Sequence, residues 1–212
     1  MPVYFYFIIA SFIVSFGLFK QPGIAFYLKL FCPFLGITIL VEYYALYLAN
    51  HGRNNLLVYS LFSVGEFIFY FYILSCIIKN SKMRLAIRYI LVINAFLALL
   101  NTFFFQKDGF NTISYSISCL LVVSFCIYFF LELFRYPKSV RLVNEPSFWI
   151  CSGLLFYYCC SFPLFGLLTF LPSMPQSLLN NIVMLMRIVN ISLYTLLMIA
   201  FVCKVRIRRE SL

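Results

Sequence analysis

The feature that most constrains this chain is its division into long apolar runs, separated by short stretches that carry charged residues, Gly, Pro or Asn. A helix needs about 20 mostly apolar residues to cross the hydrocarbon core of a bilayer. Seven runs approach or exceed that length, at residues 3–19, 24–48, 56–78, 85–105, 112–134, 148–171 and 178–203. This pattern predicts an all-α fold: a polytopic membrane protein in which residues 1–212 form one seven-transmembrane helical bundle.

The composition excludes a water-soluble globular fold. Hydrophobic residues make up 64% of the sequence and charged residues only 10%, whereas soluble domains carry about 25% charged residues. The formal net charge of +10 does not indicate nucleic-acid binding, because the basic residues lie between apolar runs and not on one solvated face. All eight cysteines lie in apolar runs without a C-x-x-C motif, so we expect them to be packing residues.

The distribution of Lys and Arg predicts the orientation of the bundle, because positive residues accumulate in cytoplasmic loops. Thirteen of these residues lie outside the runs, and two of the thirteen, Arg53 and Lys107, lie in one set of alternate loops. The other eleven lie in the opposite loops and the C-terminal tail: Lys20, Lys79, Lys82, Arg84, Arg135, Lys138, Arg141, Lys204, Arg206, Arg208 and Arg209. We therefore expect the N-terminus outside, the C-terminus in the cytoplasm and an odd number of spans.

The loops are too short to form a separate domain, and the longest covers residues 135–147. We therefore expect any function to be carried out within the bundle or by a second polypeptide. The first run lacks the positive n-region and the small-residue cleavage site of a signal peptide, so we interpret it as a span. Pro33 and Pro163 lie inside the second and sixth runs and are expected to kink them, because proline removes a backbone donor.

Two residues of opposite charge, Glu66 and Arg187, fall deep within predicted spans. At the rise of an α-helix, both lie about 14–15 Å from the outer ends of the third and seventh spans. Charge at that depth is costly unless it is compensated. We therefore expect an ion pair between Glu66 and Arg187, or a Glu66 that stays protonated beside an asparagine.

Further polar residues extend this pair into a candidate binding site in the outer half of the bundle. Glu42 lies about 10 Å from the outer end of the second span, and two asparagines seven residues apart share one face of the fourth span. The candidate ligand-binding residues are Glu42, Glu66, Asn94, Asn101, Arg187 and Asn190. In the alternative interpretation, these side chains form hydrogen bonds that fix the packing of the helices and have no further role.

The remaining charged residues have simpler interpretations. Glu132 lies about one turn from Arg135 and is expected to pair with it or to reach the membrane interface. Lys29 and Arg88 are expected to extend towards the inner membrane interface. The basic tail, residues 204–209, is expected to attract anionic lipid. The single histidine, His51, has no second ligand nearby, so we expect no metal site, and we expect no cofactor.

The sequence carries no H-E-x-x-H, G-x-S-x-G or Walker motif and no second histidine, so we expect no enzymatic activity. A retinal protein needs a lysine in the seventh span, where this chain has Arg187. The alternative to a sensory role is a small-solute transporter of the three-plus-one-plus-three helix type. The pattern P-x-x-G, which recurs at Pro33 and Pro163 in the second and sixth spans, favours that alternative.

Four stretches of the chain read NNLLVY at 54–59, GEF at 65–67, YFFLEL at 128–133 and NEPSFWICSGLLFY at 144–157. With the last span from residue 190 to 200, they resemble a family of uncharacterised seven-span membrane proteins of Bacteroidetes, related to the membrane input domains of sensor histidine kinases. The resemblance extends from about residue 50 onward, with P-x-F-W-I-x-x-G its most specific part. It implies sensing, and because no kinase follows in this chain, it implies a separate cytoplasmic partner such as a kinase.

These observations predict a non-enzymatic sensory or regulatory module in the bacterial inner membrane. It would detect a small ligand, lipid or ion in the outer half of the bundle, with the lipid bilayer as its surroundings and no nucleic-acid partner. The sequence does not specify an oligomeric state. Where the chain re-enters the membrane, we expect Ser147 to cap the sixth helix and Trp149 to lie at the interface with its N–H in water.

Overall fold

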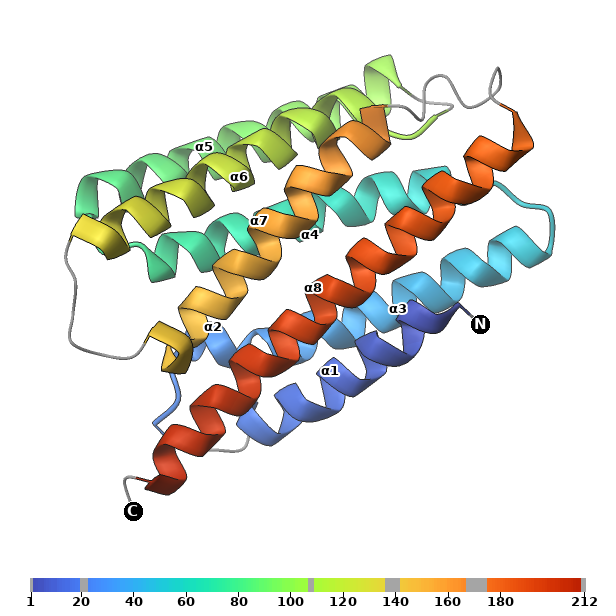
Figure 1. The fold of residues 1–212 in the computed structure, drawn as a ribbon. Coiled ribbons are helices and arrows are strands. Elements are labelled where there is room, and N and C mark those ends of the chain that lie inside the picture. Colours follow the sequence, from blue (N-terminus) through green and yellow to red (C-terminus); the bar gives the residue numbers. More distant parts are fainter. Residues whose placement is uncertain (1, 20–22, 107–108, 136–141, 167–174, 211–212) are drawn as a thin grey trace.

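The computed structural model describes residues 2–19, 23–106, 109–135, 142–166 and 175–210 (Figure 1). All regular elements in these residues are helical, which confirms the predicted all-α fold. The helices are α1 (Val3–Phe19), α2 (Phe26–Lys29), α3 (Phe31–Asn50), α4 (Leu56–Ile77), α5 (Ser81–Leu100), α6 (Thr112–Arg135), α7 (Pro146–Gly166) and α8 (Gln176–Glu210). A π-helical turn, Asn101–Phe105, extends α5, and a short 3-10 turn, Leu142–Asn144, precedes α7.

Six helical stretches among the described residues are long and apolar enough to cross a bilayer, and Val3–Leu18 is a shorter apolar helix. The six are Phe26–Asn50, Leu56–Ile77, Ser81–Phe105, Thr112–Arg135, Pro146–Gly166 and Gln176–Cys203. This is the pattern of a multi-pass membrane protein, and each stretch overlaps one of the seven predicted runs. Some predicted features lie outside the described residues. They are residues 167–171 of the sixth run, the loop residues Lys20, Lys107, Lys138 and Arg141, and the side chains of the basic tail.

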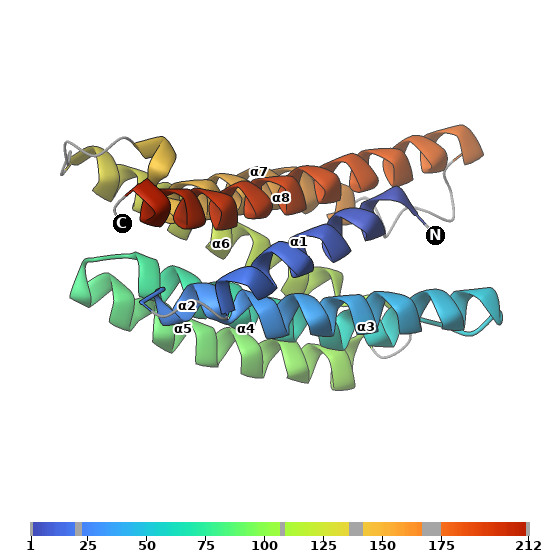
Figure 2. The same ribbon diagram turned by 90° about the horizontal axis from the view of Figure 1, so that it is seen from below.

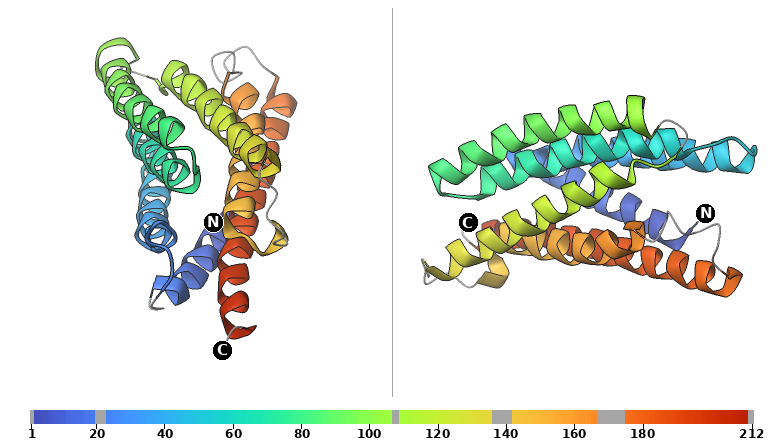
Figure 3. Two further views of the ribbon diagram at one scale, coloured as in Figure 1. Left: turned by 90° about the vertical axis from the view of Figure 1, so that its left-hand side faces the viewer. Right: turned by 90° about the horizontal axis from the view of Figure 1, so that it is seen from above.

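The helices form two layers. Figure 2 shows α2, α3, α4 and α5 in one layer and α7 and α8 in the other, with α1 crossing obliquely between them. Figure 3 shows that α6 also crosses between the layers, on the opposite side of the molecule. Helix α1 packs against α3 and α8, and α6 packs against α4, α5 and α7. The result is a bundle with a closed ring of neighbours, α1–α3–α4–α6–α7–α8, and with α5 outside it.

The second span is interrupted near Pro33, where the sequence predicts a kink. Helix α2 ends at Lys29, α3 begins at Phe31, and Leu30 lies between them. Proline has no N–H to donate to the carbonyl four residues earlier, so the helix is weakest at Lys29. Pro163 lies inside α7, near its end. Because Pro33 lies near the start of its span and Pro163 near the end of its own, the two P-x-x-G motifs do not occupy equivalent positions.

The core of the bundle is a layer of large, fully buried aromatic side chains. Tyr70 and Phe71 of α4, Tyr158 of α7 and Phe201 of α8 are each at most 1% exposed. The ring centroids of Tyr70 and Tyr158 are 5.9 Å apart, at an interplanar angle of 77°. Edge-to-face contacts of this kind add to the stabilisation from burial. The aromatic layer joins the two helical layers at the middle of the molecule.

The turn between α4 and α5 is fixed by a carboxylate from α6. Glu132 accepts hydrogen bonds from the backbone N–H of Lys79 at 2.9 Å and of Asn80 at 2.8 Å. The side chain of Asn80 in turn caps α5 by accepting from the N–H of Lys82 at 3.0 Å. The expectation that Glu132 pairs with Arg135 is wrong, because free backbone donors at the start of α5 lie within its reach.

Two expectations for the start of α7 also need correction. The helix begins at Pro146, so Ser147 lies inside its first turn, where its hydroxyl forms a 3.2 Å hydrogen bond with that of Tyr27. The indole N–H of Trp149 is not left to water, because it donates to the Val143 carbonyl at 2.7 Å. Ser147 therefore connects α7 to α2, and Trp149 connects α7 to the turn that precedes it.

Candidate functional site

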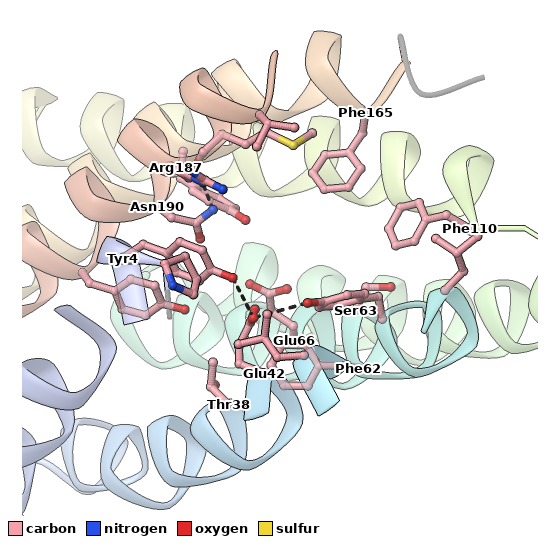
Figure 4. Close-up of a pocket in the computed structure, with 18 of the residues that line it drawn as sticks. Tyr4, Thr38, Glu42, Phe62, Ser63, Glu66, Phe110, Phe165, Arg187 and Asn190 are labelled. Atoms are coloured by element: carbon pink, nitrogen blue, oxygen red, sulfur yellow. Dashed lines mark hydrogen bonds between the residues drawn. The ribbon is translucent and has the colours of Figure 1, made fainter. Parts of the chain in front are cut away.

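A cavity of about 780 Å³ opens between the two layers, at the end of the bundle that carries the N-terminus. Its volume lies in the range of small-molecule sites, about 300–1,000 Å³. It is lined from six helices and the residues next to them: Pro2, Val3, Tyr4, Thr38, Glu42, Leu46, Asn50, Leu56, Tyr59, Phe62, Ser63, Glu66, Phe110, Tyr115, Tyr157, Phe165, Val183, Met186, Arg187, Asn190 and Tyr194. Figure 4 shows the charged and aromatic residues that point into it.

The spacing of the lining residues follows from the helical repeat. On α3 the lining positions are 38, 42, 46 and 50, and on α8 they are 183, 186, 187, 190 and 194. Residues three and four apart lie on one face of a helix. Each of these helices therefore presents one face to the cavity, and the polar members of that face include Glu42 on α3 and Arg187 and Asn190 on α8.

Glu42 is held on one wall of the cavity by two tyrosine hydroxyls. Its Oε2 accepts a hydrogen bond from Tyr4 of α1 at 2.9 Å and another from Tyr59 of α4 at 3.3 Å. These contacts connect three helices through one carboxylate. Tyr4 and Tyr59 are not among the predicted site residues, although both lie at the depth of Glu42 on neighbouring helices.

Glu66 lies on the same wall, one helix further along. Its Oε1 accepts a hydrogen bond from the hydroxyl of Tyr158, on α7, at 3.3 Å. Figure 4 shows the carboxyl groups of Glu66 and Glu42 close together, so this wall carries two acidic groups. We call it the acidic wall.

Arg187 and Asn190 point into the cavity from α8, opposite the acidic wall (Figure 4). Asn190 donates from Nδ2 to the Met186 carbonyl at 2.9 Å. The predicted Glu66–Arg187 ion pair is not formed, since no carboxylate oxygen of a described residue lies within 4.0 Å of the Arg187 guanidinium. Equal depth did not bring the two together, because α4 and α8 belong to different layers and the cavity lies between them.

Three aromatic rings form a further part of the lining, where the chain enters α6 and where α7 ends. The ring centroids of Phe110 and Phe165 are 5.1 Å apart, and those of Tyr115 and Phe165 are 4.2 Å apart. Together these rings make an apolar surface beside the charged groups.

Two of the six candidate residues lie away from the cavity. Asn94 exchanges hydrogen bonds with Ser118, at 2.8 and 3.2 Å, and so connects α5 to α6. Asn101 donates to Asn111 and, at 2.8 Å, to Gln106, in a buried cluster at the turn between the same helices. These contacts match the packing interpretation for this pair, whereas the cavity brings together Glu42, Glu66, Arg187 and Asn190.

Metal ligands are not grouped in the part of the chain that the structure describes: no three His, Cys, Asp or Glu side chains are placed to hold an ion. His51 follows the last residue of α3, and its Nδ1 contacts the Tyr47 carbonyl at 2.8 Å. The eight cysteines are free thiols. The polar side chains that line the cavity can form ionic contacts and hydrogen bonds.

Comparisons with models of known protein families, with curated proteins and with solved structures give no match to this chain.

Proposed function

We propose that this protein is a non-enzymatic sensory or regulatory module of the bacterial inner membrane, which binds a small ligand in the cavity and reports it to a cytoplasmic partner. The observation that carries this proposal is the separation of charge around the cavity. Arg187 has no carboxylate of a described residue within 4.0 Å, and the donors to Glu42 and Glu66 among the described residues are tyrosine hydroxyls. Intramembrane charges that face a cavity without pairing are typical of a functional site.

The charge distribution supports an outward-facing site. Among the described residues, Lys79, Lys82, Arg84 and Arg135 lie at the α4–α5 turn and the end of α6, at the end of the bundle opposite the cavity, as expected of the cytoplasmic side. In this orientation the cavity lies in the outer half of the bundle, and a ligand reaches it from outside the cell.

The packing below the cavity supports reception of a ligand and not its passage. One turn beyond the lining residues Glu66 and Tyr194, the side chains of Tyr70 and Leu197 are 1% and 0% exposed. Tyr158, which contacts Glu66, is itself fully buried. The cavity therefore ends on the aromatic layer.

Helix α8 provides a route by which ligand binding can reach the cytoplasm. It contains 35 residues, so it is about 52 Å long, and thus longer than a hydrocarbon core of about 30 Å. Arg187 and Asn190 lie in its cavity-facing half, and its final turns run through the basic tail. A rigid movement of α8 on ligand binding would therefore displace the tail, which a partner can detect.

Transport is a second candidate, favoured by the ring of helix contacts. The order α1–α3–α4–α6–α7–α8, with α5 outside, corresponds to two groups of three helices and a linker. Two observations count against transport: buried side chains close the inner end of the cavity, and Pro33 and Pro163 do not occupy equivalent positions in their spans.

The proposed binding function is tested by screening purified protein in lipid nanodiscs against a library of small polar metabolites, with thermal unfolding as the readout. A genuine ligand should raise the Tm of the wild type and of an Arg88→Met control, a change of the same kind on the exposed surface of α5. It should leave the Tm of a variant with both Glu66→Gln and Arg187→Met unchanged. A library without any ligand that depends on these two residues would refute the proposal.

A further inference from the structure

We infer that the ligand of the cavity is an organic zwitterion: an ammonium group and a carboxylate or phosphate group, separated by an apolar body. This inference rests on the proposed function and names its ligand class. It follows from three features of the lining, namely the acidic wall, the cationic group opposite and the aromatic rings beside them.

The acidic wall fits an ammonium group. Glu42 accepts from two hydroxyls and Glu66 from one, whereas two carboxylates have about eight lone-pair positions between them. An ammonium group offers three donors and a positive charge, and hydrogen bonds between charged partners are the strong ones. A primary amine placed between Glu42 and Glu66 would therefore satisfy acceptors that the tyrosines leave open.

The opposite wall fits an anion. Arg187 presents five N–H donors, and none of them donates to another described residue within hydrogen-bonding distance. A carboxylate or phosphate can accept two parallel hydrogen bonds from such a guanidinium, in a bidentate arrangement. Asn190 lies beside Arg187, with the carbonyl of its amide still open as an acceptor (Figure 4).

A ligand with a single charge would leave one wall uncompensated. When a ligand displaces the water of the cavity, an amine alone leaves Arg187 without a partner, and an anion alone leaves two carboxylates without one. The two walls lie on opposite sides of the cavity and form no ion pair of described residues within 4.0 Å. Phe110, Tyr115 and Phe165 offer the apolar body of the ligand a surface beside the charged groups.

The test uses four probes of similar length: aminocaproate, its methyl ester, caproate and hexylamine. Binding to the wild-type protein in nanodiscs is measured by isothermal titration calorimetry. Aminocaproate should bind about tenfold more tightly than any of the other three, because it alone makes charged hydrogen bonds on both walls. Equal binding of a singly charged probe, or no binding of aminocaproate, would overturn the inference without any variant being needed.

Variants then assign each wall. Arg187→Met should weaken aminocaproate binding to the level of hexylamine and leave hexylamine itself unchanged. A variant with both Glu42→Gln and Glu66→Gln should weaken aminocaproate to the level of caproate. Arg88→Met and Glu145→Gln, at exposed positions outside the cavity, should bind as the wild type does. A loss of binding that is the same for every probe would contradict the assignment of the walls.

The failure of this inference can be told apart from the failure of the proposed function. A metabolite from the screen that needs Glu66 and Arg187, but is not a zwitterion, would refute the ligand class alone. A screen without any such metabolite would refute both.

Discussion

At the scale of single residues, the tyrosine hydroxyls decide how the acidic wall is built. Tyr4 and Tyr59 place the Glu42 carboxylate, and Tyr158 places that of Glu66, each from a different helix. These hydroxyls are donors that carry no charge of their own. They orient the carboxyl groups and leave the remaining acceptor positions of these groups available to a ligand.

The first prediction concerns Tyr4. Replacing Tyr4 with Phe removes a 2.9 Å hydrogen bond between α1 and α3, and we expect the free energy of unfolding in mild detergent to fall by about 0.6–1.7 kcal/mol. Tyr43→Phe is the matched control, because Tyr43 lies next to Glu42 in sequence but is 57% exposed. The interpretation is wrong if the two variants lose the same stability.

The second prediction concerns Arg187. Breaking a buried ion pair costs about 3–5 kcal/mol, but Arg187 is exposed to the cavity and has no carboxylate of a described residue within 4.0 Å. We therefore expect Arg187→Met to change the free energy of unfolding by less than about 1 kcal/mol. Urea unfolding in micelles measures this change, and a loss near the ion-pair value would show that Arg187 has a partner in the membrane.

At the scale of helices, the apolar runs predicted the fold well, because the length of a span is fixed by the thickness of the bilayer. The break at Leu30 was located only as a kink at Pro33, since a single interrupted turn hardly changes the hydropathy of a run. The partners of charged residues were harder to predict. Depth follows from counting residues, but which helices face each other depends on their rotation and packing, so the Glu66–Arg187 and Glu132–Arg135 pairs were wrong.

The tyrosines of the cavity could have been found from spacing. Tyr59 and Glu66 are seven residues apart on α4 and therefore lie on one face of that helix. On α3, Glu42 lies four residues from Thr38 and from Leu46, and these three also share one face. A tyrosine on the same helical face as a deep carboxyl group carries a hydroxyl that can donate a hydrogen bond to such a group.

A third prediction follows from the contact between α6 and the α4–α5 turn. Replacing Glu132 with Ala leaves the backbone N–H groups of Lys79 and Asn80 without their carboxylate acceptor, at a cost of about 2 kcal/mol. Hydrogen exchange of these two amides should become faster. Glu145→Ala, at an exposed position, should leave their exchange unchanged, and protection that survives in Glu132→Ala would contradict the role of this carboxylate.

At the scale of the whole molecule, the cavity is open at one end of the bundle and closed towards the other. Its lining reaches Val183, which is 46% exposed, whereas Leu197 on the same helix is 0% exposed. Water therefore has access to one half of α8 from the cavity, while the other half is packed in the core.

The fourth prediction uses this difference. Val183→Cys should react with a charged, membrane-impermeant thiol reagent added to intact cells, because thiols react as hydrated thiolates. Leu197→Cys should react no faster than the wild type, whose native thiols set the background. Fast labelling of Leu197→Cys would favour a transport path. Labelling of Val183→Cys only after the cells are opened would reverse the orientation.

The buried asparagine cluster at the turn between α5 and α6 has a consequence for biogenesis. Asn111 donates to the Ala98 carbonyl at 3.0 Å and to Thr102 at 2.7 Å, and its backbone N–H donates to Ser60 of α4 at 3.2 Å. An amide without such partners is costly in hydrocarbon. We therefore expect α5 and α6 to enter the bilayer together as a hairpin, after α4. In that order the hydrogen-bond partners of Asn111 are already present when its amide leaves water.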